Sequence, residues 1–272
     1  MADRARAVLI TGTSSGIGKL TAEHFEARGW NVAATMRDPA KAEFKPSNRL
    51  RVFQLDVTKP DTIASAIGAT IDTFGSIDAL VNNAGYGLIG PFEAQTDEQM
   101  RRQFDTNVFG MMSVTRAVLP HMRKRGEGRI INVASMCGRM TLPLYTAYCA
   151  TKWSVDGFSE ALAFELNGQN IKVKIIEPGV FHTDFFTRSQ EVARKDGLTD
   201  YDPYVRNVLP NIMTWEKAAP PAGKVAEAIY TAATDRWPRL RYTPGSTFTL
   251  AARRFVPSML YMRAIKRLLN AW

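Results

Sequence analysis

The chain of 272 residues holds only two cysteines, Cys137 and Cys149, which is too few for a disulfide framework. Neither belongs to a cluster with metal-ligand spacing, so we expect no metal site. No apolar run approaches the roughly 18 residues that a membrane-spanning helix needs. The N-terminal segment has only a short apolar run, Ala7–Ile10, which is too short for the core of a secretory signal. These absences predict a reduced, cytoplasmic protein.

Acidic residues are missing from the C-terminal part of the chain. From Arg236 to Trp272 there are eight Arg/Lys and no Asp or Glu, within totals of 35 basic and 26 acidic residues. The remainder carries 27 basic and 26 acidic residues and is nearly neutral. No basic and aromatic motif recurs there, so we expect no nucleic-acid partner.

Short apolar runs alternate with longer amphipathic stretches. Expected strands are 7–11, 31–35, 51–55, 79–82, 129–134 and 172–177, and expected helices are 16–28, 61–74, 96–125, 145–166 and 224–234. Thr96 followed by Gln99 fits a capping box. The alternation predicts a single α/β domain over 1–272, a doubly wound parallel sheet with helices on both faces. The proline-containing segment at about 181–221 is expected to be an irregular substrate loop.

A glycine-rich turn follows the first expected strand. Gly12, Gly16 and Gly18 are separated by residues that include Ser14, Ser15 and Ile17. Glycine allows close approach of the backbone to a phosphate, and the N–H groups of the following helix favour a negative charge. A purely structural tight turn is the alternative, but the position between strand and helix favours dinucleotide binding.

Further motifs accompany this turn in order. They are Asn82-Asn83-Ala84-Gly85, Asn107 in DTNVFG, Ser135 in NVASMCG, Tyr148-Cys149-Ala150-Thr151-Lys152, and Pro178-Gly179 followed by Thr183. As a set, from residue 7 to about 183, they resemble the short-chain dehydrogenase/reductase family, and most closely its steroid- and retinol-dehydrogenase-like branch. The resemblance implies a Rossmann-like fold. It also implies cofactor contacts from Asn83, Ala84, Gly85, Pro178, Gly179, Val180 and Thr183.

The end of the second expected strand bears on the choice of cofactor. Met36 stands where NAD-dependent members of the family carry an acid, and Arg37 follows. A 2′-phosphate needs a cation, so Arg37, with Ser14 as a helper, predicts NADP(H). A solvated loop arginine is the alternative. Asp56 resembles the family residue beside the adenine ring, and a turn or cap aspartate is the alternative.

The catalytic candidates centre on a tyrosine and a lysine four residues apart, which share one face of a helix. A nearby ammonium favours the phenolate, so Lys152 is expected to lower the pKa of Tyr148 and allow proton exchange with a substrate oxygen. The resemblance implies that Lys152 also binds the nicotinamide ribose and that Ser135 bonds the same oxygen. The resemblance also implies that Asn107 holds a water molecule that links Lys152 to solvent. Tyr145 lacks a cation at this spacing.

These residues imply NADP(H)-dependent interconversion of a carbonyl and an alcohol. The loops around the site are rich in apolar side chains, so we expect a lipophilic substrate; Arg139 and Arg188 could still anchor an acid. The apolar candidates are Tyr86, Leu88, Leu142, Leu144, Tyr145, Phe181, Phe185, Phe186, Tyr201, Tyr204 and Trp215. A catalytically silent cofactor-binding sensor and an epimerase or dehydratase of the extended branch remain alternatives.

Two partners are considered. Apolar residues on more than one side of 145–166 predict a homodimer or homotetramer, with this helix and 96–125 at the interface. Beyond Pro257, apolar and basic residues recur at helical spacing, a pattern that can bind an anionic membrane surface. We favour the alternative, in which the basic segment at about 236–272 folds back as a wall of the substrate pocket.

Overall fold

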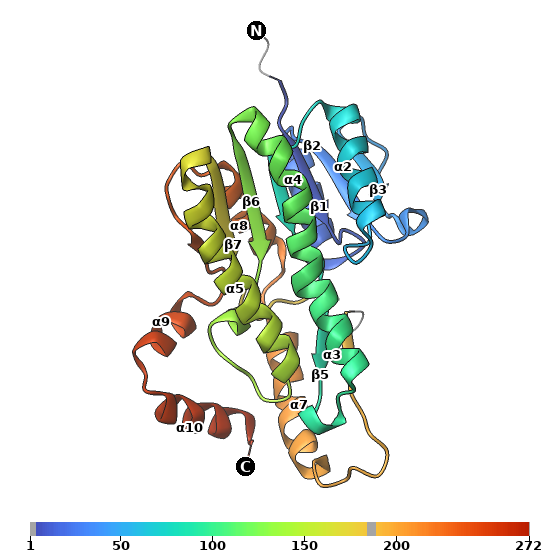
Figure 1. The fold of residues 1–272 in the computed structure, drawn as a ribbon. Coiled ribbons are helices and arrows are strands. Elements are labelled where there is room, and N and C mark those ends of the chain that lie inside the picture. The colour runs from blue at the N-terminus through green and yellow to red at the C-terminus, as the bar shows by residue number, and fades with distance from the viewer. Residues whose placement is uncertain (1–3, 184–188, 272) are drawn as a thin grey trace.

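A computed structural model describes residues 4–183 and 189–271. Its centre is a parallel sheet with the strand order β3-β2-β1-β4-β6-β7-β9 (Figure 1). The strands are β1 (Ala7–Thr11), β2 (Asn31–Met36), β3 (Leu50–Gln54), β4 (Ala79–Asn82), β6 (Gly128–Val133), β7 (Ile171–Ile176) and β9 (Arg241–Tyr242). The expected fold class is therefore confirmed. Among the expected strands the limits shift by at most one residue.

Helices cover both faces of the sheet. Alternate residues of β1 point to opposite faces: Val8 packs in one apolar cluster and Leu9 in the other. The cluster around Val8 includes α1 (Gly16–Ala27) and α8 (Gly223–Thr234). The cluster around Leu9 includes α2 (Pro60–Phe74), α4 (Met111–Arg125) and α5 (Thr146–Leu166). Burial on both faces explains why the strands are almost wholly apolar.

The strand order reverses beside β1, where β2 lies on one side and β4 on the other. Ligands of open α/β sheets bind at the carboxyl ends of the strands at such a reversal. The glycine turn after β1 and the Asn82–Gly85 segment after β4 meet there.

The expected helix 96–125 forms with one interruption. The Thr96 and Gln99 capping box is present and begins α3 (Asp97–Phe104). A turn of π-helix over Asp105–Gly110 then leads into α4. Such turns are often found at functional sites, and this one contains Asn107.

The irregular loop expected at 181–221 is wrong for much of its length. It contains β8 (Gln190–Val192), which pairs in parallel with β5 (Gly87–Ile89), and α7 (Asp202–Lys217). Pro203 falls in the first turn of α7, where a missing N–H costs nothing. Pro210 lies inside the helix, where proline removes a backbone hydrogen bond. The burial of Val208 and Ile212 on either side of it offsets the lost bond.

The basic C-terminal segment forms α9 (Thr247–Phe255) and α10 (Ser258–Leu269), which lie below the end of β7 in Figure 1. The expected helix beyond Pro257 is therefore present. Trp272 lies outside the described residues. Within the part of the chain that the structure describes, no helix is long and apolar enough to cross a membrane.

Candidate active site

The glycine turn is shaped for close approach to a ligand. Gly12 has a φ of +71°, which favours glycine, and a Cβ at this position would lie 2.8 Å from the Cα of Ala84. A Cβ on Gly18 would overlap the carbonyl oxygen of Gly12 and lie 2.6 Å from Nδ2 of Asn83. Ser15 precedes α1 and makes no side-chain bond to its first turn. The N–H groups at this helix end therefore face no competing cap and suit a phosphate.

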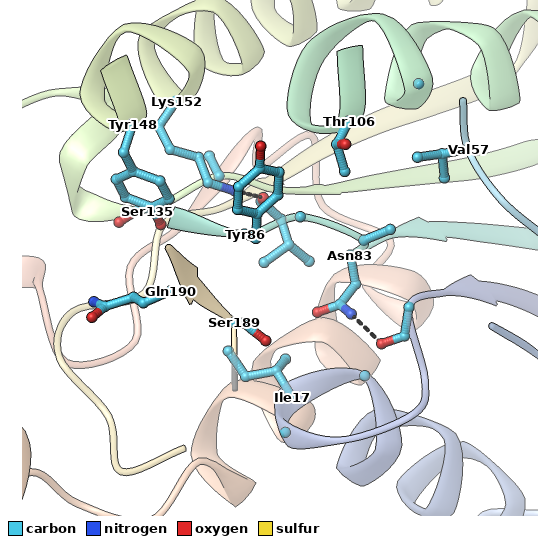
Figure 2. Close-up of a pocket in the computed structure, with 18 of the residues that line it drawn as sticks. Ile17, Val57, Asn83, Tyr86, Thr106, Ser135, Tyr148, Lys152, Ser189 and Gln190 are labelled. Carbon is cyan, nitrogen blue, oxygen red and sulfur yellow. Dashed lines mark hydrogen bonds between the residues drawn. The ribbon is translucent and has the colours of Figure 1, made fainter. Parts of the chain in front are cut away.

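Asn83 ties the segment after β4 to this turn. Its Nδ2 donates to the carbonyl oxygens of Thr11, at 3.0 Å, and Gly12, at 2.9 Å (Figure 2). The backbone N–H groups of Asn83 and Ala84 both donate to Oγ1 of Thr11 at 3.0 Å. These four bonds fix the two segments that face each other across the strand-order reversal.

Charged residues gather where β2 and β3 end. Arg37 and Asp56 line the cavity, whereas Asp38 is bonded elsewhere, accepting from the N–H of Ala40 at 3.2 Å and pairing with Lys41 at 3.3 Å. Burial alone would raise the pKa of Asp56, but hydrogen bonds from Thr58 and the charge of Arg37 hold it below its usual value. This corner therefore presents one arginine and one ionised carboxylate.

At the other end of the cavity, Tyr148, Ser135 and Lys152 lie together (Figure 2). The Ser135 side chain lies beside the Tyr148 hydroxyl and acts to lower its pKa. Ser135 Oγ also accepts from the N–H of Cys137 at 3.1 Å, as the cap of a short 3₁₀ turn. Nζ of Lys152 donates to the carbonyl oxygen of Val133 at 2.9 Å and lies 5.7 Å from the centre of the Tyr148 ring.

The pKa of Tyr148 differs from the sequence expectation. Burial raises it well above its usual value of 10.0, and the Ser135 side chain only partly offsets this effect. Burial also lowers the pKa of Lys152 to about 8, and its Nζ donates to the carbonyl oxygen of Val133. Burial therefore favours the protonated hydroxyl of Tyr148, the direction opposite to the expected phenolate.

Asn107 lies behind the cavity wall. Its Nδ2 donates to the carbonyl oxygen of Tyr86, at 2.8 Å, and to Oγ1 of Thr151, at 3.2 Å. Its Oδ1 accepts from the N–H of Tyr86 at 3.0 Å. Asn107 therefore fixes the loop after β4 against α5, and it is absent from the described cavity lining, unlike the other three catalytic candidates.

The whole cavity has a volume of about 1010 Å³. Every expected cofactor-binding residue lines it: Gly12, Ser14, Ser15, Gly16, Ile17, Gly18, Arg37, Asp56, Asn83, Ala84, Gly85, Tyr148, Lys152, Pro178, Gly179, Val180 and Thr183. Val57, Thr106, Arg102 and Glu191 are among the lining residues that sequence reasoning missed. Val57 directly follows Asp56 and Thr106 precedes Asn107, so for these two adjacency to expected residues was the only available signal.

Five of the expected substrate residues and Ile212 line the cavity, and those in one apolar cluster with Tyr148, namely Leu142, Tyr145, Ile212 and Trp215, form its apolar end. The five expected residues are Tyr86, Leu142, Tyr145, Phe181 and Trp215; Leu88, Leu144, Tyr201 and Tyr204 are not among the described lining residues. Phe185, Phe186 and Arg188 lie outside the described residues. Arg139 is wrong as an acid anchor, because it pairs at 3.3 Å with the fully buried Glu177 and does not line this cavity.

The paired strands β5 and β8 close one side of the cavity. Arg102 and Glu191 both line it and form an ion pair at 2.7 Å. Nε2 of Gln190 donates to the hydroxyl of Tyr145 at 2.8 Å. The 190–192 segment is thereby held against α3 and against the start of α5.

The expected tail wall is also wrong. Within the part of the chain that the structure describes, no residue beyond Trp215 lines the cavity. The tail does fold back, but it packs behind α7 and the 136–149 segment as a second layer.

A glycine turn at a strand-order reversal, joined by one cavity to a Tyr, Lys and Ser group, defines the class of dinucleotide-binding oxidoreductases. The short chain dehydrogenase family model matches residues 6–193. The chain belongs to the short-chain dehydrogenase family.

Two relatives are similar in sequence to this chain over most of its length. Retinol dehydrogenase 8 of Bos taurus is 34% identical, with 100% of this chain and 93% of the relative covered. Human 17-beta-hydroxysteroid dehydrogenase type 1 is also 34% identical, over 94% of this chain and 80% of the relative.

Three solved structures have folds similar to that of this chain. A short-chain dehydrogenase from Streptomyces avermitilis is 31% identical, with a TM-score of 0.81 and 100% and 97% of the two chains covered. A 3-ketoacyl-(acyl-carrier-protein) reductase from Brucella melitensis, solved with NADH, is 26% identical, with a TM-score of 0.74 and 89% and 98% covered. ElxO, solved with NADP bound, is 26% identical, with a TM-score of 0.73 and 90% and 99% covered.

Proposed function

We propose that this oxidoreductase uses NADP(H) to interconvert a lipophilic carbonyl compound and its alcohol. The observation that carries the proposal is the single cavity, because the Tyr148 and Ser135 hydroxyls stand at one end of it and the glycine turn at the other. When bound, the nicotinamide supplies or accepts the hydride. The protein supplies position and a proton.

The residues at the phosphate end fit a dinucleotide. The glycine turn and the start of α1 would receive the pyrophosphate, and Asp56 would face the adenosine. Arg37 would meet the 2′-phosphate, with Ser14 beside it, because an arginine offers the geometry and charge that a phosphate needs. This assignment favours NADP(H) over NAD(H).

Tyr148 acts as the proton donor in the carbonyl-reducing direction. Its raised pKa keeps the hydroxyl protonated at neutral pH, and Ser135 shares the hydrogen bond that would orient the substrate oxygen. As the proton leaves, negative charge develops on the phenol. Lys152, largely a cation below its pKa of about 8, then stabilises that charge from beside the ring. Asn107 is a positioning residue, since it fixes Tyr86 and Thr151 rather than facing the cavity.

The apolar end of the cavity supports a lipophilic substrate. Leu142, Tyr145, Ile212 and Trp215 line it, and none of them carries a charge that would bind an acid. The names of the retinol and hydroxysteroid dehydrogenase relatives point to the same class of substrate.

A panel assay tests the proposal. The absorbance of NADPH is followed with ketones and aldehydes of increasing apolar size, and that of NADP⁺ with the matching alcohols. We expect turnover to rise with apolar size. Cofactor binding without turnover of any substrate would favour the sensor, and turnover of a nucleotide sugar would favour the epimerase or dehydratase.

We also propose a homo-oligomer that pairs α4 and α5 across a two-fold axis. Leu162 and Leu166 are buried within the subunit, but Phe164 is 80% exposed on another side of α5. A partner subunit would cover this side chain. Light scattering at micromolar concentration should give at least twice the mass of one chain, and a monomer would contradict the proposal.

A further inference from the structure

The outer surface of the tail combines exposed apolar side chains with exposed cations. Phe255 is 80% exposed, and Phe248 on the same helix is also exposed. On α10 the exposed apolar side chains are Met259, Leu260, Met262 and Leu268. We call this the tail surface, and it also includes the cations Arg254, Arg263, Lys266 and Arg267.

The inner side of the two helices is anchored, so this exposure does not come from a loose segment. Leu250 of α9 and Tyr261 of α10 are buried in one cluster with Tyr145 and Tyr148. The Tyr261 hydroxyl accepts from the N–H of Thr141 at 3.2 Å. The guanidinium of Arg253 lies 4.6 Å from the centre of the Tyr261 ring and links α9 to α10. The tail surface therefore has a fixed orientation.

The cations of the tail surface make no ion pair among the described residues. Beside them, a cavity of about 270 Å³ between α9 and α5 is lined by Arg139, Arg253, Arg254, Trp153 and Leu250. Nε of Arg253 is buried and has no hydrogen-bond partner within the described chain. Arg139 is already paired with Glu177, so Arg253 and Arg254 are the cavity arginines that make no ion pair among the described residues, and they fit an anionic phosphate group.

We propose that the tail surface docks on an anionic phospholipid bilayer, with a headgroup phosphate in this arginine-lined cavity. Exposed phenylalanine, leucine and methionine side chains beside unpaired cations are the composition that an anionic interface stabilises. A second copy of the chain fits poorly, because an isologous contact would set these cations against themselves. A nucleic acid would leave the apolar side chains without a partner.

The tail surface lies close to the active-site cavity. Asn211 of α7 donates to the carbonyl oxygen of Leu269 at 3.2 Å, so α10 packs directly behind α7. Ile212 and Trp215 of α7 line the apolar end of the active-site cavity. Docking would therefore bring the apolar end of the active-site cavity close to lipophilic compounds dissolved in the bilayer.

Vesicle co-sedimentation of the full chain tests the charges. Vesicles of phosphatidylglycerol and phosphatidylcholine should bind it at low salt, and binding should fall at high salt and with phosphatidylcholine alone. Arg263→Gln, Lys266→Gln and Arg267→Gln together should lower the partition coefficient about 100-fold, because each cation near an anionic surface contributes about fivefold. The matched control, Lys45→Gln, Arg123→Gln and Lys224→Gln, removes three exposed cations elsewhere and should bind nearly as wild type.

A second pair of variants tests the apolar contact. Phe255→Ser should weaken vesicle binding at least several-fold, whereas Phe92→Ser, at a side chain 59% exposed away from the tail, should not. Circular dichroism confirms that each variant is folded. No binding of wild type to anionic vesicles, or equal loss in the matched control, would overturn the proposal. Binding of duplex DNA that the tail variants abolish, without vesicle binding, would overturn it in favour of nucleic acid.

Discussion

The proposed preference for NADP(H) depends on one exposed arginine. Arg37 lines the cavity beside Asp56, while the neighbouring carboxylate of Asp38 is engaged with Ala40 and Lys41. A charge-assisted bond to a phosphate contributes about 1.5–3 kcal/mol, or about 10- to 150-fold in Kd. Solvent screening at this site places the expected value near the lower end. Wild-type protein should therefore bind NADPH about tenfold more tightly than NADH.

Replacement of the arginine should reverse this order. Arg37→Asp removes the bond and places a second carboxylate beside Asp56, so the 2′-phosphate is repelled. Arg37→Gln should only abolish the preference. Lys59→Asp makes the same charge change near Asp56 but outside the cavity lining, and it controls for long-range effects.

Fluorescence titration with both cofactors measures these affinities. Wild-type protein that binds NADH as tightly as NADPH, or a Lys59→Asp variant that loses as much preference as Arg37→Asp, would refute the reasoning.

Two further predictions concern stability. Gly18→Ala should abolish NADPH binding and lower the free energy of unfolding by about 1–3 kcal/mol, because its Cβ would overlap Gly12 and Asn83. Gly68→Ala, inside α2 with open space around it, should raise the free energy of unfolding by about 0.5–1 kcal/mol. Urea titrations of both variants check this, and equal effects would contradict it. Burial and a hydrogen bond shared with Asp156 raise the pKa of Glu177 to about 7 from 4.5, so the folded state holds a proton that the unfolded chain has lost, and stability should fall as pH rises between these values. Glu177→Gln should flatten this part of the stability profile, and an unchanged slope would exclude Glu177 as its source.

The sheet could be predicted from the sequence because each strand is a short apolar run buried on both faces. The apolar runs of β1 and β4 predict strands without any information on the strands that they pair with. The candidate site could be proposed from the sequence because the Tyr148 and Lys152 spacing, the glycine turn and Ser135 occur together in one order, and the structure brings them to one cavity.

The remaining features depend on contacts between distant segments. β5 and β8 are three residues each and become strands only by pairing with each other over about a hundred residues of chain. The helix α7 contains Pro210, and tertiary burial outweighs that local signal. The ammonium of Lys152 points to Val133, which no spacing along α5 reveals. The burial that raises the pKa of Tyr148 likewise depends on packing between distant segments.

The central claim is that Tyr148 transfers the proton in a hydride-transfer reaction. The most direct test compares Tyr148→Phe with Tyr145→Phe, the neighbouring buried tyrosine, on the carbonyl substrate that the panel identifies. Loss of a general acid should lower the kcat of Tyr148→Phe by about 10²- to 10⁴-fold while the Kd for NADPH stays unchanged, and Tyr145→Phe should keep much of its activity. A Tyr148→Phe enzyme with the kcat of wild type would contradict the account.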